Sequence, residues 1–241
     1  MIETVIQVLK NAKSISVLTG AGISVNAGIP DFRGETGIYT RGLYSENVFD
    51  IDYFFENPKP FYDFVRVMYP VFEKAKPTLA HKFLADLDHN HSVCIVTQNI
   101  DLLHEKAGSK NVIHLHGSVE RSHCLKCGKE YSFERLKELV IKSAVPYCES
   151  CGGLIKPDIV FFSEPVIDFD KAIECVSASD IFFALGTSLE VYPANSLVQF
   201  ARGNKILINK KETEMDYLFD IVVHEDLDNF FKELQSKGGI V

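Results

Sequence analysis

The spacing of apolar residues along the chain switches repeatedly between helix-like and strand-like periods. Apolar side chains at positions 2, 5, 6 and 9 follow the i, i+3, i+4, i+7 pattern, which predicts an amphipathic helix over residues 2–10. The run at 15–18 has the length and β-branched content of a buried strand. Further strand-like runs occupy residues 93–96, 112–115, 159–162, 181–185, 206–208 and 221–223. Helix-like stretches lie at 79–87, 101–107, 134–142, 168–176, 193–203 and 227–234.

Strands that alternate with helices in this way predict an α/β protein with a mostly parallel, doubly wound sheet. Residues 47–76 interrupt the alternation, because they are dense in Phe and Tyr and are punctuated by prolines. We interpret them as short helices that form the core of a smaller satellite. The alternative is that some of the rings line a channel for a ligand.

Composition and charge narrow the classes of protein that fit this pattern. The 241 residues are enough for one large core, or for a main domain with a small satellite. No apolar run approaches the roughly 20 residues of a membrane span and no targeting segment is evident, so we expect a cytoplasmic protein without membrane partners. The net charge of −8 argues against nucleic-acid binding through clustered Lys and Arg, and favours basic partners.

A glycine-rich turn follows the first predicted strand. Gly20, Ala21 and Gly22 allow the backbone to turn sharply, and a helix that opens after them would direct its free N–H groups at a bound phosphate. Gly28 should end that helix early. The loop beyond it places an acid, an aromatic ring and a guanidinium at residues 31–33. A bare Gly-x-Gly is often only a tight turn, so this signal is weak alone.

Six cysteines are present, and four of them form two Cys-x2-Cys pairs. Two such pairs separated by 20 residues can complete a tetrahedral site for one structural zinc ion, with no position left open for water. Disulfides are the alternative, and a cytoplasmic setting disfavours them. The predicted ligands are Cys124, Cys127, Cys148 and Cys151. Cys94 and Cys175 have apolar neighbours, and we interpret both as small buried hydrophobic residues.

Polar residues gather where two predicted strands end. Gln98, Asn99 and Asp101 follow the strand at 93–96, and His116 follows the next strand. Carboxyl ends of parallel strands are where open α/β sheets bind ligands. A neutral imidazole in that company makes His116 a candidate general base. For the other histidines of this region we favour structural roles; they are His104, His114 and His123.

Several strings occur in a distinctive order and spacing. They are GAGIS and GIPDFRG within 20–34, TQNID at 97–101, HLHGS at 114–118, PDIVFFSE at 157–164 and GTSLEVYPA at 186–194, with the cysteine pairs between. Over essentially the whole chain this arrangement resembles the catalytic core of the sirtuins, the NAD-dependent protein-lysine deacylases, and its length resembles the compact prokaryotic members.

The resemblance implies one catalytic core over residues 1–241. Its fold would be a Rossmann-like, doubly wound parallel sheet with a smaller inserted domain that is helical and binds zinc. The Rossmann-like domain is expected at about 1–34, 78–118 and 157–241. The smaller module is expected at about 35–77 and 119–156.

The resemblance also implies an activity: transfer of the acetyl group of acetyl-lysine to ADP-ribose, with release of nicotinamide and O-acetyl-ADP-ribose. NAD would be consumed as a co-substrate, and acetylated lysine segments of proteins would be the partners. The catalytic residues would be His116, Asn99 and Asp101. NAD would contact Gly20, Ala21, Gly22, Ile29, Asp31, Phe32, Arg33, Gln98, Asn99, Ile100, Asp101, Gly186, Thr187, Ser188, Asn209, Asp226 and Leu227.

By the same resemblance, the substrate peptide would bind as an added strand between two segments of the chain. The residues implied are Val160, Phe161, Phe162, Ser163, Leu189, Glu190 and Val191. This chain departs from the family at Ser163 and Pro165, where the segment usually reads Phe-Gly-Glu with a later proline, and a serine narrows the allowed backbone angles.

The acyl group is a finer question. Sirtuins that prefer succinyl or malonyl groups resemble one another in a Tyr-x-x-Arg pair, and here Val65 takes the arginine position after Tyr62. Arg66 comes one residue late and should point elsewhere, because a helix turns about 100° per residue. We therefore expect acetyl or longer apolar acyl groups.

Three other functions compete with deacetylation. An ADP-ribosyltransferase on the same fold would use the same cleavage of NAD, and the sequence separates the two poorly. A dehydrogenase would need a site for hydride transfer, whereas the pocket residues suit removal of nicotinamide. A zinc ribbon that binds nucleic acid would conflict with the net charge and would leave His116 and Asp101 without a role.

Overall fold

The main body of the protein is a six-stranded parallel sheet with the strand order β3-β2-β1-β7-β8-β9. The structure is a computed structural model, and it describes residues 1–32, 34, 37–42 and 44–238. Its strands are β1 (Ser14–Thr19), β2 (Ser92–Thr97), β3 (Val112–His114), β7 (Ile181–Leu185), β8 (Asn204–Ile208) and β9 (Ile221–Val223). The order reverses between β1 and β7, so the sheet is doubly wound, as the alternation of strands and helices predicts.

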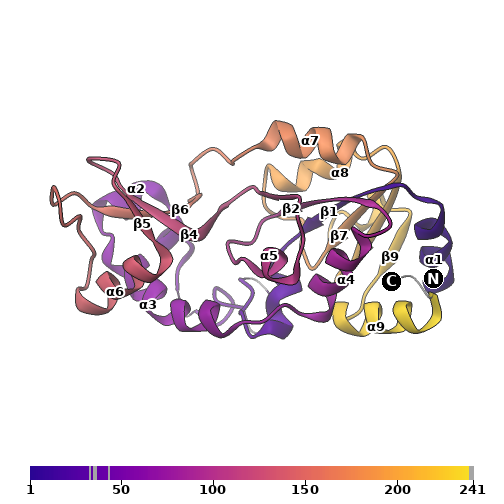
Figure 1. Cartoon of the computed structure of the whole chain (residues 1–241), viewed down its shortest axis with the longest axis horizontal. Coiled ribbons are helices and arrows are strands. Elements are labelled where there is room, and N and C mark those ends of the chain that lie inside the picture. Colours follow the sequence, from indigo (N-terminus) through magenta and orange to yellow (C-terminus); the bar gives the residue numbers. More distant parts are fainter. Residues whose placement is uncertain (33, 35–36, 43, 239–241) are drawn as a thin grey trace.

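Helices cover both faces of this sheet (Figure 1). Val17 of β1 packs into one core and the next residue, Leu18, packs into the other, because successive side chains of a strand point to opposite faces. The helices of the first core are α1 (Ile2–Asn11), α4 (Leu79–Leu87) and α9 (Leu227–Gly238). Those of the second are α7 (Phe169–Ser177) and α8 (Leu197–Phe200). None of the helices in the described part of the chain is both long and apolar enough to cross a membrane.

A smaller module lies at the opposite end of the elongated molecule from α9 (Figure 1). It contains the antiparallel sheet β5-β4-β6 and several helices, and these elements enclose a third hydrophobic core. Phe54, Phe61 and Tyr62 are fully buried there, which confirms that the aromatic stretch forms a satellite core. The elements are α2 (Ile51–Glu56), α3 (Lys59–Lys74), β4 (Gly117–Cys124), β5 (Glu130–Ser132), α6 (Phe133–Lys142) and β6 (Ile155–Ile159).

The strand expected at 159–162 is wrong in position. Strand β6 ends at Ile159 and pairs antiparallel with β4, and residues 160–161 are outside any strand. Phe162 forms only an isolated bridge to Asp50, with its N–H donating to Phe49 O at 2.7 Å. The periodicity missed β6 because a lysine and a proline stand in its middle.

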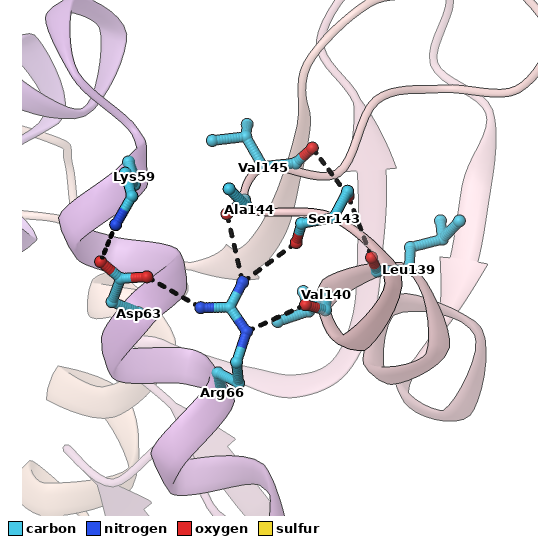
Figure 2. Close-up of polar contacts among 8 residues, drawn as sticks. All are labelled: Lys59, Asp63, Arg66, Leu139, Val140, Ser143, Ala144 and Val145. Carbon is cyan, nitrogen blue, oxygen red and sulfur yellow. Dashed lines mark hydrogen bonds and ion pairs between the residues drawn. The ribbon is translucent and has the colours of Figure 1, made fainter.

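Arg66 joins α3 to the end of α6 (Figure 2). Its guanidinium donates to Val140 O at 3.1 Å, to Ser143 O at 3.0 Å and to Ala144 O at 3.3 Å. Asp63 holds the same guanidinium at 2.8 Å. The last carbonyls of a helix lack partners inside it, so a cation at this end both satisfies them and complements the helix dipole. Arg66 therefore points at α6, in line with the expectation that it points away from Tyr62.

The expectation for Cys94 and Cys175 is wrong, because the structure joins them in a disulfide. Cys94 lies on β2 and Cys175 on α7, and their Cα atoms are 6.3 Å apart. Both residues are only partly buried. A separation of 81 residues leaves no local signal of the pairing in the sequence. The four remaining cysteines are free thiols, as the zinc interpretation requires.

Replacing Cys94 with Ser should reduce the free energy of unfolding by about 4 kcal/mol, because the disulfide closes a loop of roughly 80 residues and restricts the unfolded chain. Urea unfolding monitored by circular dichroism, with and without a reductant, would measure this. The reductant should destabilise the parent and leave the Cys94→Ser variant unaffected. Equal unfolding midpoints for parent and variant under oxidising conditions would show that the bond contributes nothing.

Candidate active site

Two glycine turns meet at the carboxyl edge of the parallel sheet. Gly20 N donates to Leu185 O at 3.1 Å, and Gly22 N donates to Gly186 O at 2.8 Å. A Cβ added at Gly20 would lie 2.8 Å from Gly186 O, and one at Gly22 would lie 2.7 Å from Gly186 Cα. Only glycine allows this backbone approach. The segment that follows, η1 (Ala21–Ala27), is a 3-10 helix that ends at Gly28 with φ 87°, so the predicted helix is short and ends where expected.

Gln98 connects the end of β2 to the loop after β7. Its side-chain amide donates to Thr187 Oγ1 at 3.1 Å, and Thr187 in turn accepts from Leu189 N at 3.2 Å. Beneath it, the Thr19 hydroxyl donates to Thr97 Oγ1 at 2.8 Å, which fixes the ends of β1 and β2 to each other. Three loops that the sequence assigned to one site thus meet at one edge.

Asp101 is the centre of a buried hydrogen-bonded group. It is 5% exposed and accepts from Ser24 Oγ at 2.9 Å and from Leu103 N at 3.0 Å. Asn99 Nδ2 donates to the same Ser24 hydroxyl at 3.1 Å. Burial raises the pKa of Asp101, while the two hydrogen bonds act in the opposite direction. Ser24 was not predicted from the sequence, since a serine in a short apolar helix carries no signal of its own.

His116 lies just after β3, and one of its two ring nitrogens already makes a hydrogen bond. His116 Nδ1 is 2.9 Å from Gln98 O, and a carbonyl can only accept, so Nδ1 carries the proton. The other nitrogen, Nε2, is then the basic one. Burial lowers the pKa of His116, while the bond to Gln98 O acts to raise it, so the imidazole is neutral at pH 7. This is the form that a general base requires.

The small module joins the main sheet at His116. Strand β4 begins at the next residue, Gly117, which pairs with Ile159 at the end of β6. Val160 N then donates to His116 O at 2.8 Å. A Cβ at Gly117 would lie 2.0 Å from the Asp158 carbonyl oxygen, and its φ of 68° also favours glycine. Both strands that carry the small antiparallel sheet therefore start or end next to the imidazole.

The apolar residues predicted for the nicotinamide pocket pack with the aromatic core of the small module. Ile29 is buried in the aromatic core of the small module, and Phe32 and Ile100 pack against that core. The ring centroid of Phe32 lies 5.8 Å from that of Phe49, edge to face. Asp31 turns instead to its own loop and accepts from Gly34 N at 3.2 Å. The predicted contact Arg33 lies outside the described residues.

The residues predicted for the adenosine end lie farther along the same edge. Asp226 begins α9 by accepting from Asp228 N at 3.0 Å, and it also accepts from Asn26 Nδ2 at 3.1 Å. Leu227 is buried in the core. Asn209 follows β8 and Ser188 follows Gly186. Asp226 thus has a clear structural role, which joins η1 to α9 through Asn26, a residue that the sequence did not single out.

The two segments predicted to bind peptide contain unusual backbone angles. Ser163 has φ 73° and Leu189 has φ 58°, both in the left-handed region that side chains other than glycine rarely adopt. Phe162 is 40% exposed and Tyr192 is 80% exposed. Val160 and Phe161 connect β6 to this turn, and Glu190 and Val191 follow Leu189. Ser163 is the position at which the sequence resemblance implies a glycine, and its positive φ is the conformation that glycine favours.

The four predicted cysteine ligands come together in the small module. Their sulfur atoms all lie within 4.8 Å of one another, with Cys124 and Cys151 at 3.4 Å and Cys127 and Cys148 at 3.7 Å. Sulfurs bound to one tetrahedral zinc at about 2.3 Å stand roughly 3.8 Å apart, so the donor set fits that ion. Hydrogen bonding from Tyr131 lowers the pKa of the Cys148 thiol to about 6, which favours the thiolate that zinc binds.

Comparison with known proteins decides the family. The model of the Sir2 family matches residues 20–193. This chain belongs to the Sir2 family. An NAD-dependent protein deacetylase of Thermotoga maritima is 42% identical over 242 residues, covering 98% of this chain and 97% of that protein. An NAD-dependent protein deacetylase 1 of Pyrobaculum aerophilum is 45% identical over 214 residues, covering 86% and 82%.

Solved Sir2 structures share the whole fold. A Sir2 complex with deacetylated p53 peptide and 3'-O-acetyl ADP-ribose superimposes with a TM-score of 0.95 at 39% identity, covering 100% of this chain and 99% of that one. A complex of Sir2 with p53 peptide and NAD+ gives a TM-score of 0.91 at 39% identity and covers both chains fully. The Sir2 resemblance of the sequence strings, and the parallel sheet expected with it, are thereby confirmed.

Proposed function

We propose that this chain is an NAD-dependent protein-lysine deacetylase that transfers the acetyl group of acetyl-lysine to ADP-ribose. The observation that carries the proposal is that His116, with Nε2 available as a base, is bonded to the main chain of Gln98, the neighbour in sequence of Asn99 in the buried Asp101–Ser24–Asn99 group. Sir2 relatives at about 40% identity are named for the same activity. Acetylated lysine segments of proteins are the substrates that we assign to it.

NAD is the co-substrate, and it supplies the ADP-ribose that receives the acetyl group. We assign its pyrophosphate to the loop of Gly20–Gly22 and to Thr187 and Ser188, where the two glycine turns meet at the carboxyl edge of the sheet. Gly20 N and Gly22 N already bond Leu185 O and Gly186 O, so the phosphate contacts would come from the other polar groups of these loops. The nicotinamide carboxamide has a ready acceptor in Asp101, and Ile29, Phe32 and Ile100 would exclude water around it.

His116 is the base of the proposed reaction. Once the acyl oxygen has displaced nicotinamide from the ribose carbon, Nε2 would take a proton from a ribose hydroxyl, so that this hydroxyl oxygen can attack the acyl carbon. Water would then complete release of the free lysine amine and leave the acetyl group on ADP-ribose. Gln98, held by Thr187, and Asn99, held by Ser24, position the ribose and a water. Because the main-chain carbonyl of Gln98 also accepts from His116 Nδ1, the base is held next to the residue whose side chain positions the ribose.

We assign one structural zinc ion to the four-cysteine site, where it stabilises β4, β5 and β6 without contact with the substrate. The division into a Rossmann-like domain and a smaller helical and zinc-binding domain, with the boundaries expected from the sequence, is part of the same proposal. So is a cytoplasmic location. The Cys94–Cys175 disulfide is unusual there, since the cytoplasm keeps most thiols reduced.

One assay tests the proposed activity. The protein is incubated with NAD and an acetyl-lysine peptide, and nicotinamide, NADH and the peptide mass are followed together. Nicotinamide release that depends on the peptide, with loss of the acetyl mass, supports deacetylation. A gain of ADP-ribose mass on a protein would point to ADP-ribosyl transfer, and the appearance of NADH would refute both.

Succinyl-lysine peptide should be a poor substrate, with kcat/KM about tenfold or more below that of the acetyl-lysine peptide, because neither Tyr62 nor Val65 gives the succinyl carboxylate a charged partner. Tyr62 is fully buried and its hydroxyl donates to Ile155 O, Val65 is buried and apolar, and Arg66 is committed to α6. Parallel assays with acetyl, butyryl and succinyl peptides measure the ratio. Equal rates for succinyl and acetyl peptides would contradict the prediction that Tyr62, Val65 and Arg66 provide no charged partner for an acyl carboxylate.

A further inference from the structure

The residues just after β6 form a turn that is closed twice. Glu164 N donates to Phe161 O at 3.1 Å, which is the hydrogen bond of a four-residue turn. The Glu164 carboxylate folds back and accepts from Phe161 N at 2.8 Å. The third residue of the turn is Ser163, with φ 73°, a value for which type II turns prefer glycine. The Glu164 side chain therefore helps to hold Ser163 in a backbone conformation that serine rarely adopts.

A buried lysine fixes that carboxylate. Lys156 of β6 is 5% exposed, and its Nζ lies 2.9 Å from Glu164 Oε2. The same Nζ donates to Ile159 O at 2.7 Å and lies 4.5 Å from the centroid of the Phe161 ring. A buried ammonium group is costly unless its surroundings compensate it. All three groups that contact the Lys156 ammonium lie within residues 159–164, so the lysine stabilises the conformation of that segment.

The opposite edge of the turn is attached to α2. Phe162 N donates to Phe49 O at 2.7 Å, and Ile51 N donates to Phe162 O at 3.3 Å. The Ser163 hydroxyl donates to Asp50 Oδ2 at 3.3 Å, while Oδ1 of Asp50 caps the start of α2. The turn is thus held from the side of α2 by main-chain bonds and from the side of β6 by the ion pair. A peptide added as a strand must use the backbone that remains.

We propose that Lys156, acting through Glu164, is a positioning residue for the acyl-lysine peptide. The inference rests on the proposed function, and it concerns the residues that determine how the peptide binds. Lys156 does not touch the reacting atoms. It sets the conformation of the turn at 161–164. Strand addition depends on the directions of the main-chain groups that this turn leaves for the peptide, such as those of Ser163, because hydrogen bonds weaken steeply with misalignment. The ion pair makes no described bond to the glycine turns or to Asp101, so we expect its effect to fall mainly on the peptide.

The test is a comparison of KM values in the full-length, zinc-loaded protein. The double variant Lys156→Met with Glu164→Gln removes both charges, so no unpaired charge is buried, and leaves an amide oxygen for Phe161 N. We expect the KM for an acetyl-lysine peptide to rise about tenfold, with the KM for NAD and kcat within about twofold of the parent. The single variant Lys156→Arg keeps the positive charge and leaves Glu164 in place, so its KM for the peptide should equal that of the parent. The matched control is Lys237→Met with Glu233→Gln, an exposed pair on α9 that should change none of these values.

The outcomes separate cleanly. A peptide KM that stays at the parent value, or KM values for peptide and NAD that rise together, would overturn the inference. If the double variant fails to fold, Glu164→Asp replaces it: both charges stay, but the carboxylate no longer reaches Phe161 N and Lys156 at once, and the peptide KM alone should rise at least threefold. A parent protein without peptide-dependent nicotinamide release would overturn the proposed function itself, and this inference with it.

Discussion

The His116→Ala variant is expected to fold, to retain zinc and to lose deacetylation by a factor of about 10²–10⁴, the usual contribution of a positioned general base. The ring is partly buried but makes its one described hydrogen bond to Gln98 O, so the truncation leaves no buried charge and should cost little stability. Steady-state rates with acetyl-lysine peptide, together with zinc content and thermal unfolding, measure all three properties.

The matched control is His89→Ala, which removes an exposed imidazole just before β2, at the opposite end of that strand from Gln98. It should leave the rate unchanged. Full deacetylase activity in the His116→Ala variant would refute the assignment of His116 as base, whereas loss of activity in both variants would indicate a general effect of histidine removal.

The same assignment predicts the acidic limb of the pH profile. A base must be neutral in the enzyme, and burial lowers the pKa of His116 below its ordinary value near 6.5. The rate should therefore fall on the acidic side with a midpoint below pH 6.5, as protons occupy Nε2. A limb centred above pH 7 would mean that a different group acts as base.

Cys124→Ala should be the most damaging substitution for stability. A structural zinc site contributes on the order of 10 kcal/mol to the folding of a small module, and three thiolates hold the ion far less well than four. Cys124 is buried at the end of β4, and Cys151 Sγ lies 3.4 Å from its sulfur. We expect less than one zinc per chain and a fall of several kcal/mol in the free energy of unfolding.

Activity should also fall in this variant, because β6 leads directly into the peptide turn at 161–164 and loses its partner strand when β4 is released. Lys126→Ala, a substitution between Cys124 and Cys127, keeps all four sulfurs and serves as the control. Metal analysis and chemical denaturation report the result. A Cys124→Ala protein as stable and as rich in zinc as the parent would contradict a structural ion.

The sequence predicted the parallel sheet well because each of its strands is a nearly uninterrupted apolar run, as strands buried on both faces must be. It failed at β6, where Lys156 and Pro157 break the pattern. Proline has no N–H for a ladder, and a lysine inside a core makes sense only with Glu164 and Ile159 O in place. Such a compensation is three-dimensional and leaves no periodic trace.

The candidate site shows the same limit. Gln98, Asn99, Asp101 and His116 could be predicted because polar residues at strand ends are conspicuous against apolar runs. Ser24, which bonds both Asn99 and Asp101, could not, because its partners are more than 70 residues away. The Cys94–Cys175 bond was missed for the same reason. Pairing between distant segments becomes visible only when the fold brings them together.

The junction at His116 has a consequence for motion. Gly117 pairs with Ile159, and Val160 N donates to His116 O, so the two strands that carry the zinc-site sheet leave and re-enter the main sheet at one place. If the small module swings relative to the main sheet about this pivot, displacement grows with distance from it. The imidazole, and the turn at 161–164 that begins one residue beyond the pivot, would then move least, while Cys124 and the zinc site at the far end of β4 would move most.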